Sequence, residues 1–459
     1  MQKQPCVAAL VLALLISALA GTQLTSWVGA NPMQAPPINT IYIRSDGSIE
    51  PSTAPIQRAG SVYSFLSDLT NSTIEVQCDN VVIDGKGFSL SGYGAQWYAG
   101  ITLSNRRGVT VKNLYISQFG HDIKMDNAEQ NSIIENRLES AMDGVKMINS
   151  NHNQISGNWI SGVTYGVHGS GSFNQITANN FSGNAYSVRC WCDYNIISNN
   201  FFQDQTSVFL NGEDGCHYNT ISGNTMQGSE DGVYLLGFST NNMVFGNNIT
   251  GKQKHGIYIT HSWNNTIYGN HLANNRVGIQ IGFDPSLHEY YPSSNTTFYH
   301  NNLLSNVENV RIERAQDGSL PSNHWDNGNE GNYWSDYLTR YPNASEIGNT
   351  GIGDTPYSIF MQDGSLIDQD HYPLMVPFDI SSINLEFPEW EYTPPSLSPL
   401  PSLSPEPTPS TSPSPSPLPL QEPTSTPEPF PTTLVVATSG ASVAVVGLGL
   451  LVYFKKRER

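Results

Sequence analysis

Seven short segments in the middle of the chain share one pattern, and this pattern decides the fold. The segments are NSIIENRL (residues 131–138), NQISGNWI (153–160), NQITANNF (174–181), NIISNNFF (195–202), NTISGNTM (219–226), NMVFGNNI (242–249) and NTIYGNHL (265–272). They begin 21–24 residues apart. A repeat of this length cannot bury its apolar side chains by itself, so successive repeats must stack on one another.

The apolar residues of each repeat indicate short β-strands. They occupy the third and eighth positions of each segment, and two further apolar columns, which start at Val145 and Met147, lie two residues apart. This alternation is typical of strands, and the repeats lack the 3.6-residue period of a helix. We therefore predict an all-β fold, a right-handed parallel β-helix of roughly ten coils of 21–24 residues.

The sixth position of each segment is an asparagine in all seven repeats, from Asn136 to Asn270. Asparagine tolerates left-handed backbone conformations, and stacked asparagine amides form ladders of hydrogen bonds. We expect these residues to turn the chain in the left-handed region and to bond from coil to coil.

The sequence on either side of the repeats predicts caps. We expect an N-terminal cap over residues 38–79, the β-helix repeats over residues 80–312 with an insertion near residues 283–294, and a C-terminal cap over residues 313–380. Caps are expected because an open end of a β-helix exposes strand edges and apolar columns.

The two ends of the chain predict export and a membrane anchor. Residues 1–30 resemble a secretory signal peptide, although an uncleaved anchor would have a similar sequence. A Pro/Ser/Thr-rich stalk (393–431) precedes an uncharged stretch (434–454) that is long enough for a transmembrane helix in the lipid bilayer. The basic tail (455–459) predicts a single-pass protein with its body extracellular and its C-terminus cytoplasmic. A sorting signal that is later removed would look much the same.

The charge of the chain excludes one class of partner. It carries 21 Lys and Arg residues against 39 Asp and Glu residues, a net charge of −18. A body with this excess of negative charge repels phosphate backbones, so we expect no nucleic-acid partner.

Four motifs outside the seven segments resemble those of a known family. They are VVIDGKGFSLSG (81–92), GNYWSDY (331–337), GIGDTPY (351–357) and DHYPLM (370–375). Together with the NxIxxNxI repeats, they resemble the NosD-type family of right-handed parallel β-helix proteins (CASH domains with PbH1 repeats), in its surface-anchored prokaryotic form. The resemblance implies the fold, a place at the cell surface and, from the family's label as periplasmic copper-binding proteins, an association with copper.

One outward row of the predicted sheet combines basic and aromatic side chains. Strand alternation directs to solvent the residues between the last two apolar columns, which are Lys146, His168, Arg189, Phe209, Tyr234, Tyr258, Gln280 and Arg311. Aromatic rings stack on sugars and cations pair with uronate carboxylates, so this row is the candidate face for extracellular glycans. Ordinary exposed strand residues would give the same pattern.

Carboxylates in neighbouring coils are candidates for catalysis. Asp231 aligns with His255, Glu230 with Lys254, and Asp193 with Glu213. Asp143 shares the repeat position of Asp231 but lies four coils away, roughly 19 Å at 4.8 Å per coil, which is too far for a glycosidase pair. Cross-coil ion pairs also explain the alignments, and the catalytic alternative is a polysaccharide lyase, a glycoside hydrolase or an epimerase.

The cysteines allow two hypotheses. Cys192 and Cys216 lie just past equivalent strands of successive coils, which predicts a disulfide between them in an oxidising environment. The alternative is a soft metal site in which Cys190, Cys192, Cys216 and His217 bind copper as Cu(I).

Calcium binding and N-glycosylation are two further hypotheses about the surface. Glu346 and Asp354 are the candidate Ca²⁺ ligands, since they are the only carboxylates in residues 343–357, although a Ca²⁺ ion takes six to eight oxygens. Sequons for N-glycosylation occur at Asn71, Asn180, Asn248, Asn264, Asn295 and Asn343.

We therefore expect a membrane-anchored cell-surface protein without catalytic activity, which binds extracellular carbohydrate or serves as an envelope or adhesion component. A polysaccharide-active enzyme and a copper-binding accessory protein are the two alternatives.

Overall fold

The computed structural model describes most of the predicted caps and repeats. It covers residues 39–212, 215–282, 292–314 and 318–385. The predicted signal peptide, stalk, membrane helix and basic tail lie outside these ranges, as does most of the predicted insertion. Within the described ranges, no helix is both long enough and apolar enough to span a membrane.

The first described strands form the N-terminal end of the solenoid. They are β1 (Asn39–Ile43), β2 (Ile49–Glu50), β3 (Ile56–Ala59), β4 (Val62–Phe65), β5 (Leu69–Thr70) and β6 (Ser72–Val76). Strand β3 forms an antiparallel hairpin with β4, and β1 pairs in parallel with β6. Strand β4 then pairs in parallel with β7 (Val82–Asp84), the first strand of the repeats.

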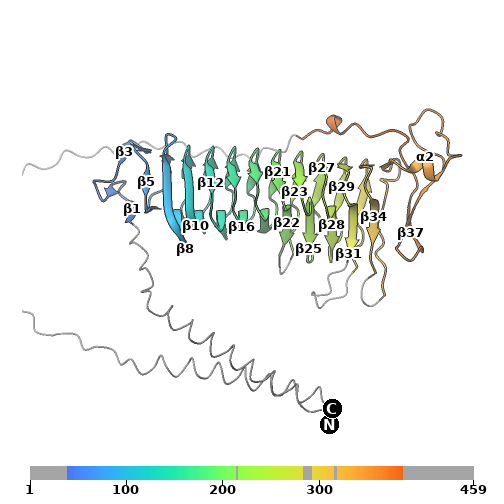
Figure 1. The fold of residues 1–459 in the computed structure, drawn as a ribbon, viewed down its shortest axis with the longest axis horizontal. Coiled ribbons are helices and arrows are strands. Elements are labelled where there is room, and N and C mark those ends of the chain that lie inside the picture. The colour runs from blue at the N-terminus through green and yellow to red at the C-terminus, as the bar shows by residue number, and fades with distance from the viewer. Residues whose placement is uncertain (1–38, 213–214, 283–291, 315–317, 386–459) are drawn as a thin grey trace, which may run out of the picture. The chain divides into compact units, whose positions relative to one another are not determined.

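Each repeat contributes strands to three faces, and like strands of successive coils pair in parallel (Figure 1). The first face contains β7, β9 (Thr110–Lys112), β11 (Ser132–Ile134), β14 (Gln154–Ser156), β17 (Gln175–Thr177), β20 (Ile196–Ser198), β23 (Thr220–Ser222), β26 (Met243–Phe245), β29 (Thr266–Tyr268) and β32 (Thr297–Tyr299). The second face contains β12 (Arg137–Glu139), β15 (Trp159–Ser161), β18 (Asn180–Ser182), β21 (Phe201–Asp204), β24 (Thr225–Gly228), β27 (Asn248–Thr250), β30 (His271–Ala273), β33 (Asn302–Leu304) and β35 (Tyr333–Trp334). The third face contains β13 (Asp143–Ile148), β16 (Tyr165–Ser170), β19 (Tyr186–Trp191), β22 (Thr206–Asn211), β25 (Val233–Leu236), β28 (His255–Thr260), β31 (Val277–Gly282) and β34 (Glu308–Ile312).

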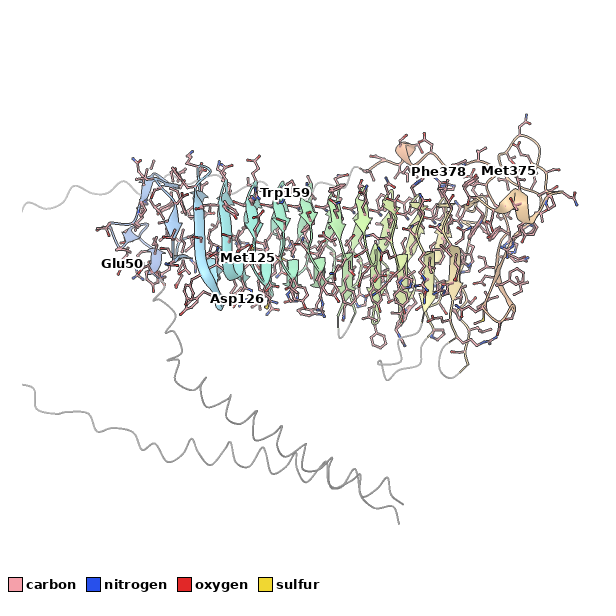
Figure 2. All side chains as sticks on the ribbon, viewed as in Figure 1. Glu50, Met125, Asp126, Trp159, Met375 and Phe378 are labelled. Atoms are coloured by element: carbon pink, nitrogen blue, oxygen red, sulfur yellow. A yellow bond between two sulfur atoms is a disulfide. The ribbon has the colours of Figure 1, made fainter. Side chains whose placement is uncertain are left out.

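Two long strands, β8 (Ser89–Ser104) and β10 (Tyr115–Asp126), run through both the second and the third face. In Figure 2, Trp159 of the second face lies on one edge of the solenoid, and Asp126, at the end of β10, lies on the opposite edge. The predicted all-β parallel solenoid of about ten turns is confirmed.

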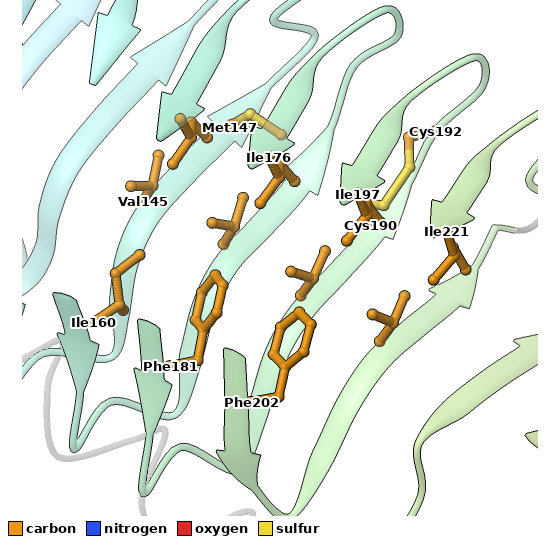
Figure 3. Close-up of a cluster of buried hydrophobic side chains, with 14 of the residues drawn as sticks. Val145, Met147, Ile160, Ile176, Phe181, Cys190, Cys192, Ile197, Phe202 and Ile221 are labelled. Atoms are coloured by element: carbon orange, nitrogen blue, oxygen red, sulfur yellow. A yellow bond between two sulfur atoms is a disulfide. The ribbon is translucent and has the colours of Figure 1, made fainter. Parts of the chain in front are cut away.

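The interior consists of the predicted apolar columns. Ile155, Ile176, Ile197 and Ile221 align in register on the first face and are buried (Figure 3). On the second face the rings of Phe181 and Phe202 stack with centroids 5.0 Å apart. Like side chains therefore pack on like side chains, and burial of this apolar surface drives the stacking.

Asparagine side chains bond the coils to one another, as predicted. The backbone N–H and the side-chain amide of Asn200 both donate to Oδ1 of Asn224, at 2.9 and 3.0 Å, and the amide also donates to the carbonyl oxygen of Ile176 at 2.8 Å. Oδ1 of Asn200 accepts the same two bonds from Asn179. Each buried amide is thus satisfied by the equivalent residue of the next coil.

The ladder is longer than predicted, and a second ladder accompanies it. The first ladder continues beyond Asn270 into Asn301 and Asn332. The second joins the first-position asparagines of the segments, from Asn131 to Asn265, by equivalent bonds. The two ladders occupy two corners of the solenoid.

The prediction that the sixth-position asparagines adopt left-handed backbone conformations is wrong by one residue. The positive φ values belong to the residue before each asparagine, for example 55° at Glu135, 54° at Ala178 and 56° at Asn199. That residue turns the chain at the corner between the first and second faces. The turn directs the following asparagine side chain inward, where it joins the ladder.

Trp325 and the motifs GNYWSDY and DHYPLM close the apolar core. Trp325 is buried and stacks on Phe298, the last residue of its apolar column, at 4.3 Å. Asp370 of DHYPLM accepts hydrogen bonds from the backbone N–H of Asn332 at 2.7 Å and from Nε1 of Trp334 at 2.8 Å. Burial raises the pKa of Asp370 to about 7.

The remaining C-terminal elements surround this cap. They are α2 (Tyr337–Arg340), the antiparallel pair β36 (Tyr357–Phe360) and β37 (Leu366–Asp370), and the 3₁₀ helix η1 (Ile380–Ser382).

We expect the substitution Asn200→Ala to lower the free energy of unfolding by about 2–4 kcal/mol, because it leaves buried donors and acceptors of two neighbouring coils unsatisfied. Urea unfolding measures the change. Gln203→Ala, at an exposed position of the same coil, is the control and should change stability little. Equal effects of the two substitutions would contradict a stabilising role of the ladder.

The raised pKa of Asp370 predicts how stability depends on pH. The folded state holds the proton up to about pH 7, whereas the unfolded carboxyl group releases it near its ordinary value of 3.8. Stability from this group is therefore fully present below pH 4 and is lost as the pH rises to about 7. The difference in unfolding free energy between the wild type and Asp370→Asn should change across this window, and a pH-independent difference would refute the assignment.

Candidate functional site

The predicted binding row is a column of neighbouring side chains on the outside of the third face. Strand register pairs Lys146 with His168, His168 with Arg189, and so on through Gln280 to Arg311. Lys124 of β10 extends the row by one coil. The row therefore has the predicted geometry, and its role in binding stays a prediction.

The row is not open to solvent along its whole length. Phe209 and His168 are each only 7% exposed and Gln280 only 4%, so the expectation that every member faces solvent is wrong for these three. The ring of Phe209 lies between those of Tyr186 and Tyr234, at 5.6 and 4.8 Å. The Gln280 amide donates to Glu313 at 2.9 Å.

The three aromatic members of the row stack on one another and on two tyrosines from the column of Asp143, Tyr186 and Tyr165. Tyr165, Tyr186, Phe209, Tyr234 and Tyr258 form one continuous stack with centroids 4.5–5.6 Å apart and rings within 24° of parallel. A sugar ring cannot enter between rings at this separation. The expected stacking of sugars on ring faces is therefore not available at Phe209 and Tyr234, and Tyr258, which ends the stack, has one face covered by Tyr234.

A cluster of ionisable groups lies at the N-terminal end of the row. The carboxylate of Asp143 is fully buried, and its two oxygens lie 2.6 Å from Nδ1 of His121 and 2.5 Å from Nδ1 of His168. Nζ of Lys146 lies 3.1 Å from the same nitrogen of His168. Burial by itself would raise the pKa of Asp143, but the hydrogen bonds from His121 and His168 outweigh it and lower the pKa.

Lys146 is a cation that feels the charge of this carboxylate. Burial lowers its pKa, the charge of Asp143 opposes that effect, and the positive charges of Arg189 and Lys124 lower the pKa further. A half-buried ammonium group among other cations is incompletely compensated, so this end of the face favours an anion.

Arg189 lies next to the cluster and is surrounded by rings. Its guanidinium carbon is 5.3–5.9 Å from the ring centroids of Tyr165, Tyr186, Trp191 and Phe209. Nη1 donates to the hydroxyl group of Tyr165 at 3.2 Å, while Nε is buried without a hydrogen-bond partner among the described residues. The rings thus hold the guanidinium group in place and leave one of its donors unused.

A second pair lies farther along the same face. Nδ1 of His255 is 2.7 Å from the carboxylate of Asp231, and Lys254 donates to Glu230 at 2.9 Å, so the predicted cross-coil contacts exist. Arg311, at the C-terminal end of the row, is paired with Glu308. These charges are compensated within the protein, as is that of Lys124, whose Nζ lies 3.6 Å from the carboxylate of Asp126. Among the described residues, Lys146 and Arg189 form no such ion pair with a carboxylate.

The other predicted carboxylate pair is not assembled in the described part of the chain. Glu213 lies outside the described residues. Asp193 accepts a hydrogen bond from the backbone N–H of His217 at 2.7 Å, so its carboxylate holds a turn between coils.

The predicted disulfide between Cys192 and Cys216 is wrong. Cys190 is bonded to Cys192 (Figure 3), because both side chains point inward on either side of the outward-pointing Trp191. Cys216 is buried in the next coil, where its thiol donates to the carbonyl oxygen of Cys190 at 3.3 Å.

The predicted copper donors do not form a metal site. Cys190 and Cys192 are joined to each other, and burial raises the pKa of Cys216 to about 11, which disfavours its thiolate. Nδ1 of His217 lies 2.8 Å from the hydroxyl group of Thr240. No group of three or more His, Cys, Asp or Glu residues within the described ranges is arranged to hold a metal ion. The described residues therefore do not fit the copper that the resemblance implies.

The candidate calcium ligands are engaged in loop structure. Glu346 accepts from the backbone N–H of Gly351 at 2.7 Å, and Asp354 accepts from that of Ser345 at 3.0 Å. Among the six sequon asparagines, Asn264, Asn295 and Asn343 are exposed and Asn71, Asn180 and Asn248 are half-buried. Glycosylation at these positions stays a prediction.

The Asp143 cluster is the part of the site that the sequence did not reveal. His121 and Asp143 occupy one column in adjacent coils, and this alignment was the available signal. His168 lies three residues beyond that column, in the next coil, so alignment by column does not bring it to Asp143.

Comparison with known proteins identifies one matching family and several solved structures of low sequence identity. The model of the NosD family, described as periplasmic copper-binding protein, matches residues 66–191 and 170–339. No curated protein matches the chain.

Three solved structures illustrate the distant similarity. The chain is similar to a mutant of the periplasmic alginate epimerase AlgG at 15% identity and a TM-score of 0.48, over 62% of this chain and 82% of that one. It is similar to DFA-IIIase from Arthrobacter chlorophenolicus A6 in complex with GF2 at 14% identity and a TM-score of 0.38, over 53% of this chain and 66% of that one. It is also similar to the catalytic domain of GH87 alpha-1,3-glucanase in complex with tetrasaccharides at 14% identity and a TM-score of 0.40, over 58% of this chain and 59% of that one. At these values the similarities carry no information about activity.

The family match covers more than half of the chain, and it agrees with the parallel coils, the aliphatic columns and the asparagine ladders described above. The chain therefore belongs to the NosD family of right-handed parallel β-helix proteins.

Proposed function

We propose that the third face binds acidic polysaccharides, such as uronate polymers, at Lys124, Lys146 and Arg189. One observation carries this proposal: three cations lie within four successive coils of one outward row, on a chain whose net charge is −18. At their centre the carboxylate of Asp143 is buried and in contact with two imidazoles, while Lys124 also lies 3.6 Å from the carboxylate of Asp126. The surface charge at this place is therefore opposite to that of the chain as a whole.

Arg189 has a donor for a carboxylate. Its Nε is buried without a partner among the described residues, and Nη1 already donates to Tyr165, so Nη2 is the guanidinium nitrogen that remains for a ligand. A guanidinium N–H donates a charge-assisted hydrogen bond to a carboxylate oxygen. Because the surrounding rings hold the guanidinium group, little side-chain entropy is lost on binding.

The spacing of the cations suits a linear polymer. Successive coils are about 4.8 Å apart, so Lys124, Lys146 and Arg189 line a track across the strands and along the axis of the solenoid. Trp191, which is 39% exposed, lies beside this track. Its ring is the one at this end that can stack on a sugar, since the column from Tyr165 to Tyr258 is stacked on itself.

We propose that this face acts outside the cell, on a body attached to the membrane. The support is the sequence of residues 1–30 and 393–459, which predicts export, a stalk and a membrane helix. Protease added to intact cells should remove the β-helix and leave the basic tail protected. Protection of the β-helix in intact cells would contradict this placement.

A second candidate function is supported by the hydrogen bond between Asp143 and His168. A buried carboxylate that accepts from Nδ1 orients an imidazole as a general base. In a lyase step, His168 would take the proton from the carbon next to the uronate carboxylate while Lys146 and Arg189 stabilise the resulting negative charge. The neighbouring glycosidic bond would break, with its electron pair leaving on oxygen as a carbon–carbon double bond forms. An epimerase would instead return a proton from the opposite face.

We expect Lys146→Ala and Arg189→Ala each to weaken binding of alginate or polygalacturonate at least about tenfold, because each removes a charge-assisted contact. Isothermal titration calorimetry at two salt concentrations measures the effect. Lys254→Ala is the matched control, since Lys254 is a cation of the same face that is already paired with Glu230. The proposal fails if the three variants bind equally or if the wild type binds neutral polysaccharides as tightly.

The lowered pKa of Lys146 predicts a pH dependence. Loss of its proton removes a positive charge, so affinity for a polyanion should decrease as the pH rises, and the decrease should begin below the ordinary lysine value of 10.5. Lys146→Arg keeps its charge and should move the decrease to higher pH. Identical pH profiles for the two proteins would exclude Lys146 from the binding site.

The catalytic candidate predicts unsaturated or epimerised products. If it is correct, His168→Ala should lower kcat by about 10²–10⁴-fold, as expected for loss of a general base. Product formation is measured by ultraviolet absorbance for unsaturated sugars and by NMR for epimers. Binding without any product in the wild type would exclude catalysis on the polymer tested and leave the binding proposal intact.

A further inference from the structure

The last described residues form a strap along the corner between the first and second faces. Beyond the C-terminal cap, the backbone N–H and carbonyl oxygen of Phe378 bond to the side chain of Asn302, both at 2.8 Å, and its ring stacks on His300 at 4.1 Å. From there the chain runs back toward earlier coils, where Ile383 and Leu385 lie on the corner (Figure 1).

Glycines make room for this strap. A Cβ atom at Gly223 would lie 2.8 Å from Leu385, one at Gly246 would lie 3.2 Å from Leu385, and one at Gly269 would collide with Ile383. These glycines occupy the left-handed corner position, which accepts asparagine at Asn199. Left-handed geometry alone therefore does not require glycine in all three coils, whereas a Cβ atom would press against the strap, most strongly at Gly269.

The same corner is uncovered in the preceding coils. Gly269 is buried and Gly246 and Gly223 are half-buried, but Asn199, Ala178 and Gly157 are exposed. Gly157 borders an open depression of about 600 Å³. Lys86, Tyr115, Arg137 and Trp159 are among its lining residues. Trp159 is 47% exposed and lies on the same edge of the solenoid as Phe378 (Figure 2).

The chain after Leu385 has the length and the side chains to reach this depression. Gly157 lies three coils before Gly223, about 14 Å at 4.8 Å per coil. An extended chain covers this distance in roughly four to five residues at 3.3 Å each. The residues after Leu385 are Glu-Phe-Pro-Glu-Trp-Glu-Tyr (386–392), so an extended chain that continued in this direction would bring Trp390 to the Gly157 coil.

We propose that residues 386–392 continue the strap along this corner and seat Trp390 against Trp159 and Tyr115. The argument is continuity with the contacts that Phe378, Ile383 and Leu385 already make, together with the distance to be covered. The strap would then bind the C-terminal coils to the N-terminal ones and fix where the stalk leaves the β-helix.

A photocrosslinking experiment on the full chain tests the proposal. Trp159 is replaced by p-benzoylphenylalanine, the protein is irradiated, and crosslinked peptides are identified by mass spectrometry. We expect a crosslink within one chain to a peptide that contains residues 386–392. The same probe at Tyr218, an exposed aromatic residue at another corner, should not reach that peptide. Crosslinks from position 159 to a second copy or to other segments, or no crosslink, would overturn the proposal.

Hydrogen exchange provides a second measurement that does not depend on the probe. The double variant Phe387→Ala/Trp390→Ala should increase amide exchange at residues 135–137 and 157–159, at the rim of the depression. Phe430→Ala, in the predicted stalk, is the matched control and should leave exchange unchanged. If the double variant exchanges like the wild type at these residues, the segment does not lie in the depression.

Discussion

The hydrogen bonds between stacked asparagine side chains constrain the rest of this structure. Each buried amide finds its partners on the equivalent residue of a neighbouring coil, so a shift of one residue would leave several buried polar groups unsatisfied. Hydrophobic burial favours stacking but does not fix the register, since Ile, Val and Leu exchange readily in a column. The amide ladders supply the register, and the apolar columns align because of it.

Fixed register is also what builds the site. It places residues about one repeat apart in the sequence next to each other on the third face, so Asp143 meets His121 from the coil before it and His168 from the coil after it. The same alignment gathers Lys124, Lys146 and Arg189 in one place on an acidic chain. Farther along the face, aligned charges such as Asp231 and His255 neutralise one another. The face therefore divides into a part where cations gather around a buried carboxylate and a part where aligned charges are paired.

The sequence predicted what depends on periodicity and missed what depends on the direction of a side chain. Register between columns follows from counting residues, which is why the row from Lys146 to Arg311 was found. Counting does not show that the rings of Phe209 and Tyr234 cover each other, or that Cys190 and Cys192 both point inward around Trp191. The left-handed conformation was predicted for the sixth-position asparagine, but it belongs to the residue before it. The prediction was one position too late because the residue that turns the chain and the residue that buries its amide are adjacent.

A β-helix held by ladders can gain or lose whole coils during evolution, because every rung offers the next one the same bonds. Duplication of one repeat would lengthen the solenoid without a new core or a new corner. The strap sets a limit to such growth, since Ile383 and Leu385 fit glycines of particular coils. An added or deleted rung between Gly223 and Gly269 would put a bulkier residue under the strap or leave a glycine uncovered. The strap thus restricts the number of coils between Gly223 and Gly269. We expect variation in coil number among related chains to occur mainly outside this interval.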